Sequence, residues 1–244
     1  MASDSNPRLP APIGEVNVHL LYFKGVTEYL EDFLVRINTP DIITAVITFF
    51  NRVNFNVPQL FKFVSHTVAF GLVKRVEVTF YYDAADLIVP HPSFPHDFRA
   101  DNDGFPQISV LCNAFDWKVS FLVQICSQLW PLLSGVEEFV IFSYVQDPLD
   151  WQDVDHTQWL ELFRPFIAVQ RLNIYGLEEA IAPALRELTG ARVMEVLPAL
   201  RTLGVKGPYL SGSVRQALEP FITARHLSNH PVTFCKGESL WYLD

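Results

Sequence analysis

Hydrophobic residues recur in short runs along this chain, and a segment with helical spacing follows most runs. The clearest example is residues 197–207, LPALRTLGVKG, which we interpret as the end of a helix, a turn at Leu197-Pro198 and a strand that runs into glycine. Similar phrases recur at intervals of about 30 residues, a period typical of stacked-repeat proteins. The pattern therefore predicts a chain built from repeated strand–helix units.

Eight segments have the alternation or the β-branched content expected of strands. They are residues 16–25, 42–50, 73–81, 107–112, 138–143, 170–175, 200–206 and 232–235. Helical spacing occurs in residues 27–35, 58–65, 119–133, 157–163, 178–188 and 214–224. Thr27 and Asp155 are expected to cap two of these helices at their N-termini. Pro and Gly punctuate residues 82–106, which we interpret as a long loop with room for one short extra strand at 87–89.

A helix between two strands returns the chain parallel to the first strand. We therefore expect an α/β fold, an irregular leucine-rich-repeat-like solenoid with about eight parallel strands on its concave side and helices on its convex side. Residues 1–14 are predicted to be a disordered lead-in, 15–236 the solenoid and 237–244 a C-terminal tail. The alternative is a Rossmann-like domain, but the first strand ends in Phe23-Lys24-Gly25-Val26, which is not the Gly-rich fingerprint of that fold.

Composition narrows the classes of function. The chain is 50% hydrophobic and 18% charged, so it can bury a large core. Its net charge is −9, and its 18 Lys and Arg residues are scattered, so neither a nucleic-acid partner nor an anionic membrane is expected. The apolar run at 42–50 is too short to span a bilayer.

The search for chemistry predicts no catalytic, cofactor-binding or metal site. The three cysteines, Cys112, Cys126 and Cys235, are far apart and have no ligand spacing, which fits a reducing compartment, cytoplasmic or nuclear. His91 and His96 lie near several aspartates, but the calcium-loop pattern is absent. No nucleophile elbow, zinc-protease motif or P-loop occurs. We therefore do not expect an enzyme.

Aligning the repeats separates the two faces of the predicted sheet. Leu203 and Val205 align with other apolar residues that are expected to point inward. The alternate positions mix charged and aromatic residues, as a partner-binding surface would. This predicted concave-face set is Arg75, Glu77, Thr79, Glu138, Phe142, Arg171, Asn173, Tyr175 and Lys206. A second set, Trp151, Asp153 and Asp155, is predicted to lie at the rim of that face.

Several phrases, taken in order, resemble a known family. They include ITFFN at 47–51, VPQL at 57–60, WQD at 151–153, TQWLEL at 157–162, IAPAL at 181–185 and VLPAL at 196–200. Together they cover most of residues 14–235 and resemble the C-terminal leucine-rich-repeat-like region of the F-box proteins of mushroom-forming fungi.

The resemblance implies a receptor that selects target proteins for a ubiquitin ligase. In that family an F-box docks on the Skp1 adaptor and the repeats bind the target. No F-box motif follows Leu9-Pro10 in this sequence, so Skp1 is expected as a partner only if an F-box lies upstream. The expected function is therefore a non-enzymatic protein-binding module, either part of such a receptor or a stand-alone derivative. The alternative is an α/β enzyme with an unrecognised active site in the loops at 82–106 and 147–157.

Overall fold

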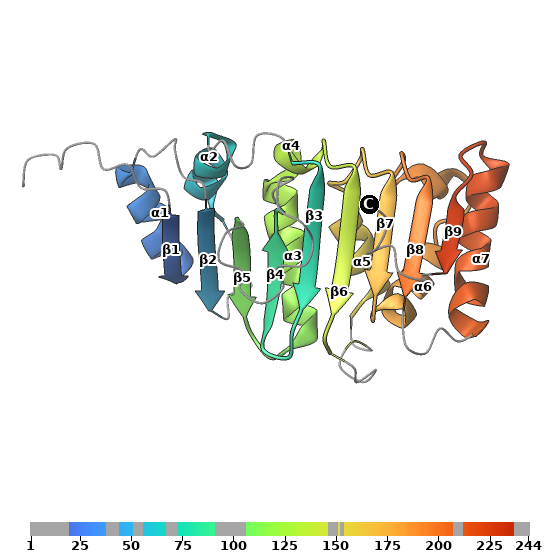
Figure 1. Cartoon of the computed structure of the whole chain (residues 1–244), viewed down its shortest axis with the longest axis horizontal. Coiled ribbons are helices and arrows are strands. Elements are labelled where there is room, and N and C mark those ends of the chain that lie inside the picture. The colour runs from blue at the N-terminus through green and yellow to red at the C-terminus, as the bar shows by residue number, and fades with distance from the viewer. Residues whose placement is uncertain are drawn as a thin grey trace, which may run out of the picture.

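The protein forms an open, mostly parallel sheet of nine strands with helices between most of them (Figure 1). This computed structural model describes residues 20–37, 44–50, 56–66, 73–90, 106–145, 151, 154–206 and 212–236. The α/β class predicted from the sequence is therefore confirmed. The predicted lead-in at 1–14 and the tail at 237–244 lie outside the described residues.

All eight predicted strands are present, and a ninth strand lies in the segment predicted to be a loop. The strands are β1 (Leu20–Gly25), β2 (Thr44–Phe50), β3 (Arg75–Phe80), β4 (Ala84–Ile88), β5 (Gln107–Leu111), β6 (Glu138–Ser143), β7 (Arg171–Tyr175), β8 (Thr202–Lys206) and β9 (Thr233–Lys236). Strand β4 is longer than the short strand considered at 87–89 and begins earlier.

The helices also match the predicted spacing, with two corrections at their ends. Thr27 is the first residue of its helix rather than the cap, which is Val26. The single helix predicted at 119–133 is two helices, because the helical conformation is interrupted at Leu129. Pro131 lies in the first turn of the second helix, where the backbone N–H that proline lacks would have no partner within the helix. The helices are α1 (Thr27–Arg36), α2 (Pro58–His66), α3 (Phe115–Gln128), α4 (Trp130–Leu133), α5 (His156–Phe163), α6 (Glu178–Arg186), the 3-10 helix η3 (Gly190–Met194) and α7 (Gly212–Leu227).

The order of the strands differs from simple stacking. The order across the sheet is β1-β2-β5-β4-β3-β6-β7-β8-β9, and β4 is antiparallel to both β3 and β5. The expectation of eight parallel strands stacked in chain order is therefore wrong in the middle of the sheet. There the chain crosses from β2 to β3, returns through β4 to β5, and then crosses to β6.

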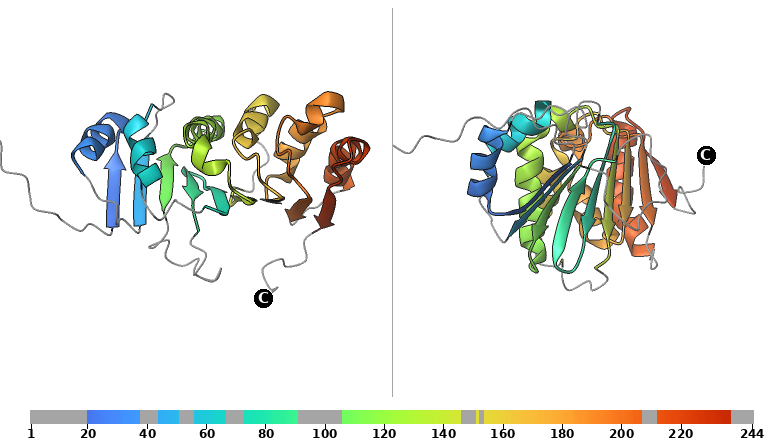
Figure 2. Two further views of the ribbon diagram at one scale, coloured as in Figure 1. Left: turned by 90° about the horizontal axis from the view of Figure 1, so that it is seen from above. Right: turned by 60° about the vertical axis from the view of Figure 1, so that its left-hand side comes forward.

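The topology places the described crossover helices on the same face of the sheet. Parallel crossovers are right-handed, so the direction of each step decides which face its helix covers. The steps from β1 to β2, β2 to β3, β5 to β6 and onward to β9 all run in one direction along the sheet. The steps that run backward, through β4, contain no helix in the described residues. Figure 2 accordingly shows the described helices on one face, whereas a doubly wound fold has helices on both.

Strands β6 to β9 form the regular half of the sheet. The residues paired across its three strand boundaries are Glu138 with Arg171, Arg171 with Thr202, and Thr202 with Thr233. These partners are 33, 31 and 31 positions apart in the sequence. Strands β1 to β5 form the irregular half. At its boundary with the regular half, Arg75 of β3 pairs with Glu138 of β6, which is 63 positions away in the sequence because β4, β5 and α3 intervene. The repeat of about 30 residues therefore holds from β6 onward.

The core lies between the sheet and the helices. The residues predicted to point inward, among them Leu172, Leu203 and Val205, are buried there. Aromatic rings fill much of this layer. The ring of Phe139 stacks on that of Phe166 with centroids 4.1 Å apart, and Phe80 stacks on Phe115 at 4.8 Å. Burial of these rings stabilises the fold by roughly 1.5–3 kcal/mol each.

Candidate functional site on the helix-free face

The face of the sheet opposite the described helices, here called the helix-free face, brings the predicted concave-face residues together. Register places them in three rows across β3, β6 and β7, and in the third row also β8. The rows are Arg75, Glu138 and Arg171; Glu77 and Asn173, with Val140 of β6 between them; and Thr79, Phe142, Tyr175 and Lys206. The side chain of Lys206 lies outside the described part of the structure. The alternation read from the sequence therefore predicted the neighbours on this face.

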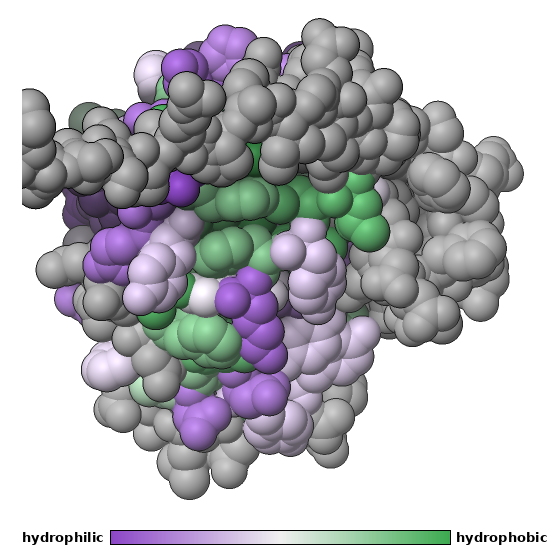
Figure 3. All heavy atoms as spheres, turned by 90° about the vertical axis from the view of Figure 1, so that its left-hand side faces the viewer, coloured by the Kyte–Doolittle hydropathy of each residue, from purple (hydrophilic) through white to green (hydrophobic). Residues whose placement is uncertain are grey.

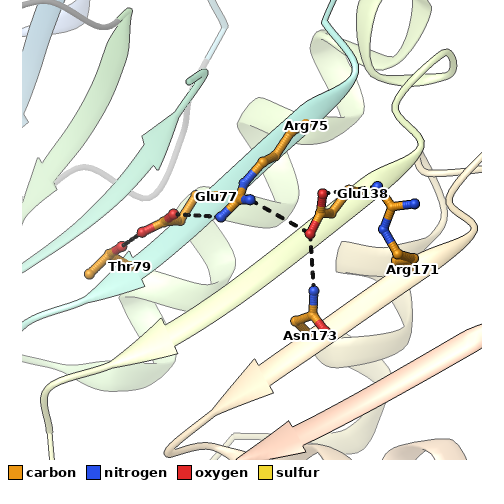
Figure 4. A network of polar contacts seen from close by, with 6 residues as sticks. All are labelled: Arg75, Glu77, Thr79, Glu138, Arg171 and Asn173. Atoms are coloured by element: carbon orange, nitrogen blue, oxygen red, sulfur yellow. Dashed lines mark hydrogen bonds and ion pairs between the residues drawn. The ribbon is translucent and has the colours of Figure 1, made fainter. Parts of the chain in front are cut away.

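Charged side chains from three strands form a connected network at one end of this face (Figure 4). Arg75 lies between two carboxylates, with guanidinium–carboxylate distances of 3.7 Å to Glu77 and 3.6 Å to Glu138. Arg171 approaches the other oxygen of Glu138 at 3.1 Å. Two positive and two negative charges thus alternate across the strands, so the network has no net charge. The side chain of Arg171 is 55% exposed, which leaves this guanidinium accessible to a carboxylate on a partner.

Asn173 links the charged network to the regular half of the sheet. Its Nδ2 donates to Oε1 of Glu138 at 3.2 Å, and its side chain lies across Gly204 on the next strand. A Cβ at position 204 would come within 2.3 Å of the Asn173 Oδ1. Glycine at 204 is therefore what leaves room for the amide, and the two residues form one unit.

An aromatic cluster lies beside the network, toward the carboxyl ends of the parallel strands. Tyr81 and Tyr144 stack with centroids 5.2 Å apart and planes 14° from parallel. Phe142 contacts Tyr144 at 4.6 Å and Tyr175 at 5.9 Å. Tyr144 is exposed and Tyr175 is buried. Tyrosine and arginine are enriched in the residues that dominate protein interfaces, so this cluster is suited to contact a partner.

Sequence analysis missed two members of this cluster. Tyr81 and Tyr144 follow the last residues of β3 and β6. Tyr81 is the last residue of the strand predicted at 73–81 and Tyr144 follows the one predicted at 138–143, but neither was included in the predicted concave-face set. The signal was present, because Tyr81 continues the alternation of residues 75, 77 and 79, and Tyr144 continues that of 138, 140 and 142.

A buried acid on β4 is the second feature that sequence analysis missed. Asp86 is opposite Thr79 on one neighbouring strand and Ser109 on the other, so it lies on the helix-free face. Its Oδ2 accepts a hydrogen bond from Nε2 of Gln107 at 2.8 Å. Burial raises the pKa of Asp86 to about 6, against the hydrogen bonds from Ser109 and Gln107, which lower it.

The predicted rim residues have different environments. Trp151 is buried, and its ring packs edge-on against Phe115 at 6.0 Å, so it belongs to the core instead of an exposed rim. Asp155 is exposed and caps α5, accepting from the backbone N–H of Thr157 at 3.0 Å, as predicted for a cap. Hydrogen bonds from that amide and from the Thr157 hydroxyl lower the pKa of Asp155. Asp153 lies outside the described residues.

The described residues contain no group of three or more His, Cys, Asp and Glu side chains suited to a metal ion. His91 and His96 lie outside the described residues, as does most of the loop at 147–157. Burial raises the pKa of the Cys112 and Cys126 thiols, which suppresses their thiolate forms. No described helix is both long enough and apolar enough to cross a bilayer.

The comparisons with known proteins identify no relative. The chain matches no family model, no curated protein and no solved structure.

Proposed function

We propose that this protein is a non-enzymatic binding module of the leucine-rich-repeat type, and that it binds a target protein through the helix-free face. The observation that carries the proposal is that one face holds both the exposed guanidinium of Arg171, at the start of β7, and the aromatic cluster around Tyr144, just past the end of β6. Their neighbours on the strands are fixed by pairing, so the binding surface is held in place before a partner arrives.

The arrangement of the repeat supports the solenoid interpretation. Spacings of 33, 31 and 31 positions from β6 to β9 are those of a strand–helix unit added repeatedly in one direction. The described helices occupy one face of the sheet (Figure 2), as the helices on the convex side of a solenoid do. In the irregular half, the antiparallel strand β4 interrupts the series of parallel strands. The described helices nevertheless stay on one face of the sheet.

The topology supports a binding module over the alternative α/β enzyme. In open α/β sheets, ligands bind at a crevice where parallel crossovers reverse direction and helices change face. In this sheet the reversal runs through antiparallel β4, so the described helices do not change face there. The two loops proposed for an active site lie largely outside the described residues.

The family resemblance suggests how such a module would be used. We propose that the chain is the target-recognition part of an F-box-type substrate receptor, or a stand-alone derivative of one, in the cytoplasm or nucleus. Its partners would then be a target protein and, if an F-box lies upstream, the Skp1 adaptor. Reading the coding sequence upstream of Met1 and testing that product against purified Skp1 distinguishes the two versions.

The binding face is tested by comparing proteins captured by matched variants. We expect Tyr144→Ala/Arg171→Glu to lose the partners that the wild-type chain captures. The control Trp117→Ala/Arg164→Glu makes the same kinds of change at exposed residues on the helix side, Trp117 in α3 and Arg164 at the C-cap of α5, and should retain them. Loss of the same partners from both variants, with both folded by circular dichroism, would contradict a binding site on the helix-free face.

A further inference from the structure

Along β6 and β7, the helix-free face is exposed at its two ends and buried between them. At the amino ends of these strands, the side chain of Arg171 is 55% exposed. Just past their carboxyl ends, Tyr144 is 44% exposed. Val140 and Asn173, which belong to the row between them, are buried. A partner on this face therefore meets two separate contact points, one at each end of the strands.

The distance between the two contact points is set by the strands. Arg171 is opposite Glu138, and Tyr144 lies six residues after Glu138. At about 3.3 Å per residue, this length of strand spans about 20 Å. An extended segment of a partner covers the same distance in about six residues, and residues six apart in such a segment point to the same side. A helix would need about 14 residues to do so, and more of the partner would have to be ordered.

The contact point at Arg171 suits a carboxylate. Among the described residues, Arg171 contacts Glu138 alone, through Nη2, and the carboxylate of Glu138 is shared with Arg75. A guanidinium has several N–H donors in a planar fork, and this fork can bind a carboxylate with two hydrogen bonds. The neighbouring Glu137 is already paired with Lys74. The exposed part of Arg171 is therefore suited to a second carboxylate.

The contact point at Tyr144 suits a cation. The ring of Tyr144 stacks on that of Tyr81, and aromatic ring faces attract Lys and Arg. Tyr82 and Asp83 form the exposed turn that follows Tyr81, so a carboxylate lies at this end. Register places Lys206 on β8, two strands or about 10 Å from β6, on the side away from that turn. This contact point therefore favours a positive side chain, whereas the other favours a negative one.

We propose that the target is bound as an extended segment that carries Asp or Glu for Arg171 and, six residues away, Lys or Arg for the Tyr144 end. This inference rests on the proposed function, because it names the chemistry of the target at the same face. The net charge of −9 adds selectivity, since an acidic segment that lacks the basic residue is repelled by the chain as a whole. The result is a charge pattern that can be measured in bound peptides.

Selection from a library of random peptides tests this pattern directly. Peptides of about 12 residues are long enough to span both contact points. The immobilised full chain should enrich peptides with opposite charges six residues apart. Arg171→Glu should instead enrich peptides with basic residues at both positions, because the charge at one contact point is reversed. A wild-type chain that enriches no charge pair at this spacing, or the same pattern from both proteins, would overturn the proposal.

Two control variants test the location of the contact points. Exposed aromatic side chains also gather at the β1–α1 end of the sheet, where Figure 3 shows a hydrophobic area bordered by hydrophilic side chains. Phe33→Glu, in α1 at that end, should leave the enriched pattern unchanged. Arg215→Glu, at an exposed position of α7, reverses the same charge as Arg171→Glu and should also leave it unchanged. Loss of the pattern from either control, when circular dichroism shows it to be folded, would overturn the assignment of the two contact points.

Fluorescence polarisation with an enriched peptide tests the spacing. Replacing its acidic residue by Ala should raise the dissociation constant on the order of 10-fold. Moving that residue to four positions from the basic one shortens the distance to about 13 Å and should have a similar effect. Equal binding at both spacings would overturn the extended arrangement.

The failure of this inference is distinguishable from the failure of the proposed function. If Tyr144→Ala/Arg171→Glu loses the captured target proteins but the enriched peptides carry no charge pair, the helix-free face binds targets by another chemistry and this inference is wrong. If that variant keeps its target proteins, the proposed function itself is wrong.

Discussion

Among the described residues, each half of the sheet contains one buried cation that binds backbone carbonyls, but the two cations stabilise different kinds of connection. In the regular half, Arg225 of α7 donates to η3 and to the loop between η3 and β8. In the irregular half, Lys118 of α3 donates to the carbonyls of Tyr81 at 2.7 Å and Tyr82 at 2.6 Å, in the turn between β3 and β4. The carbonyls that Arg225 binds are those of Val193 (3.5 Å), Leu197 (3.3 Å), Pro198 (3.2 Å) and Leu200 (2.8 Å).

The two cations stabilise the feature that is characteristic of their half of the sheet. Arg225 joins a helix to the loop of the preceding unit, 25 to 32 positions earlier, so it reinforces the stacking of one repeat on the next. That loop includes Leu197, whose φ of +48° is unfavourable for a leucine. Lys118 instead fixes the turn at which the chain reverses. Arg225 thus connects two neighbouring repeats, whereas Lys118 stabilises the turn of the β3–β4 hairpin.

Arg225→Met gives the largest expected effect. The substitution leaves buried carbonyls without donors, and we expect the free energy of unfolding to fall by about 3–5 kcal/mol. Urea unfolding followed by circular dichroism measures the loss. Arg215→Met, at an exposed position on the same helix, should stay within about 0.5 kcal/mol of the wild-type value. Comparable losses for the two variants would mean that the carbonyl contacts of Arg225 contribute little.

Lys118→Met should have the next largest effect and lower the free energy of unfolding by about 2–4 kcal/mol, because two backbone carbonyls lose their hydrogen-bond donor. Amide hydrogen exchange shows which part of the sheet is destabilised. Protection should fall first at the β3–β4 turn, where the N–H of Tyr81 donates to the carbonyl of Ala84, and β7 and β8 should keep theirs. Lys62→Met, at an exposed position on α2, is the control. A uniform loss of protection over both halves would contradict a local role for Lys118.

Asp86 makes the irregular half sensitive to pH. Its pKa of about 6 in the folded protein exceeds the 3.8 of an ordinary aspartate. The folded state therefore retains a proton that the unfolded state loses, and stability falls as the pH rises from about 4 to about 6. The loss is on the order of 2–3 kcal/mol above pH 6.

Asp86→Asn should remove this dependence. The amide can still accept from Gln107 and carries no charge to bury. At pH 7 the free energy of unfolding of the variant should exceed that of the wild-type chain by up to about 2–3 kcal/mol. At pH 4 the two values should be nearly equal. Urea unfolding at pH 4, 5, 6 and 7 measures the difference. The same difference at pH 4 and pH 7 would show that the effect has another cause.

These two halves also differ in how far the sequence predicts them. From β6 to β9, strands, period and inward residues follow from alternation, because each unit packs on its neighbour in the sequence. The reversal at β4 could not be predicted in this way. Its residues Ala84, Ala85 and Asp86 have low strand propensity, and they form a strand because β3 and β5 pair with both edges.

The same reason separates the predicted and the missed parts of the site. The rows through Arg75, Glu138 and Arg171 come from in-register parallel strands, so alternation within each strand was sufficient to predict their common face. Asp86 joins Thr79 and Ser109 only because the antiparallel strand lies between them. Trp151 was predicted at the rim from its polar neighbours in the sequence, but burial of its large ring outweighs that local context.

Gly204→Ala is the smallest expected effect and tests the link between the regular half and the charged network. The new Cβ displaces the amide of Asn173, which gives up its hydrogen bond to Glu138, so we expect a loss of about 1–2 kcal/mol. Gly135→Ala, where no atom lies within 4 Å of the new Cβ, controls for the change of residue type. In an Asn173→Ala background the clash disappears, so Gly204→Ala should become neutral or stabilising there. A double-mutant cycle measured by urea unfolding gives the coupling, and an equal loss with and without Asn173 would mean that the amide is not what requires glycine.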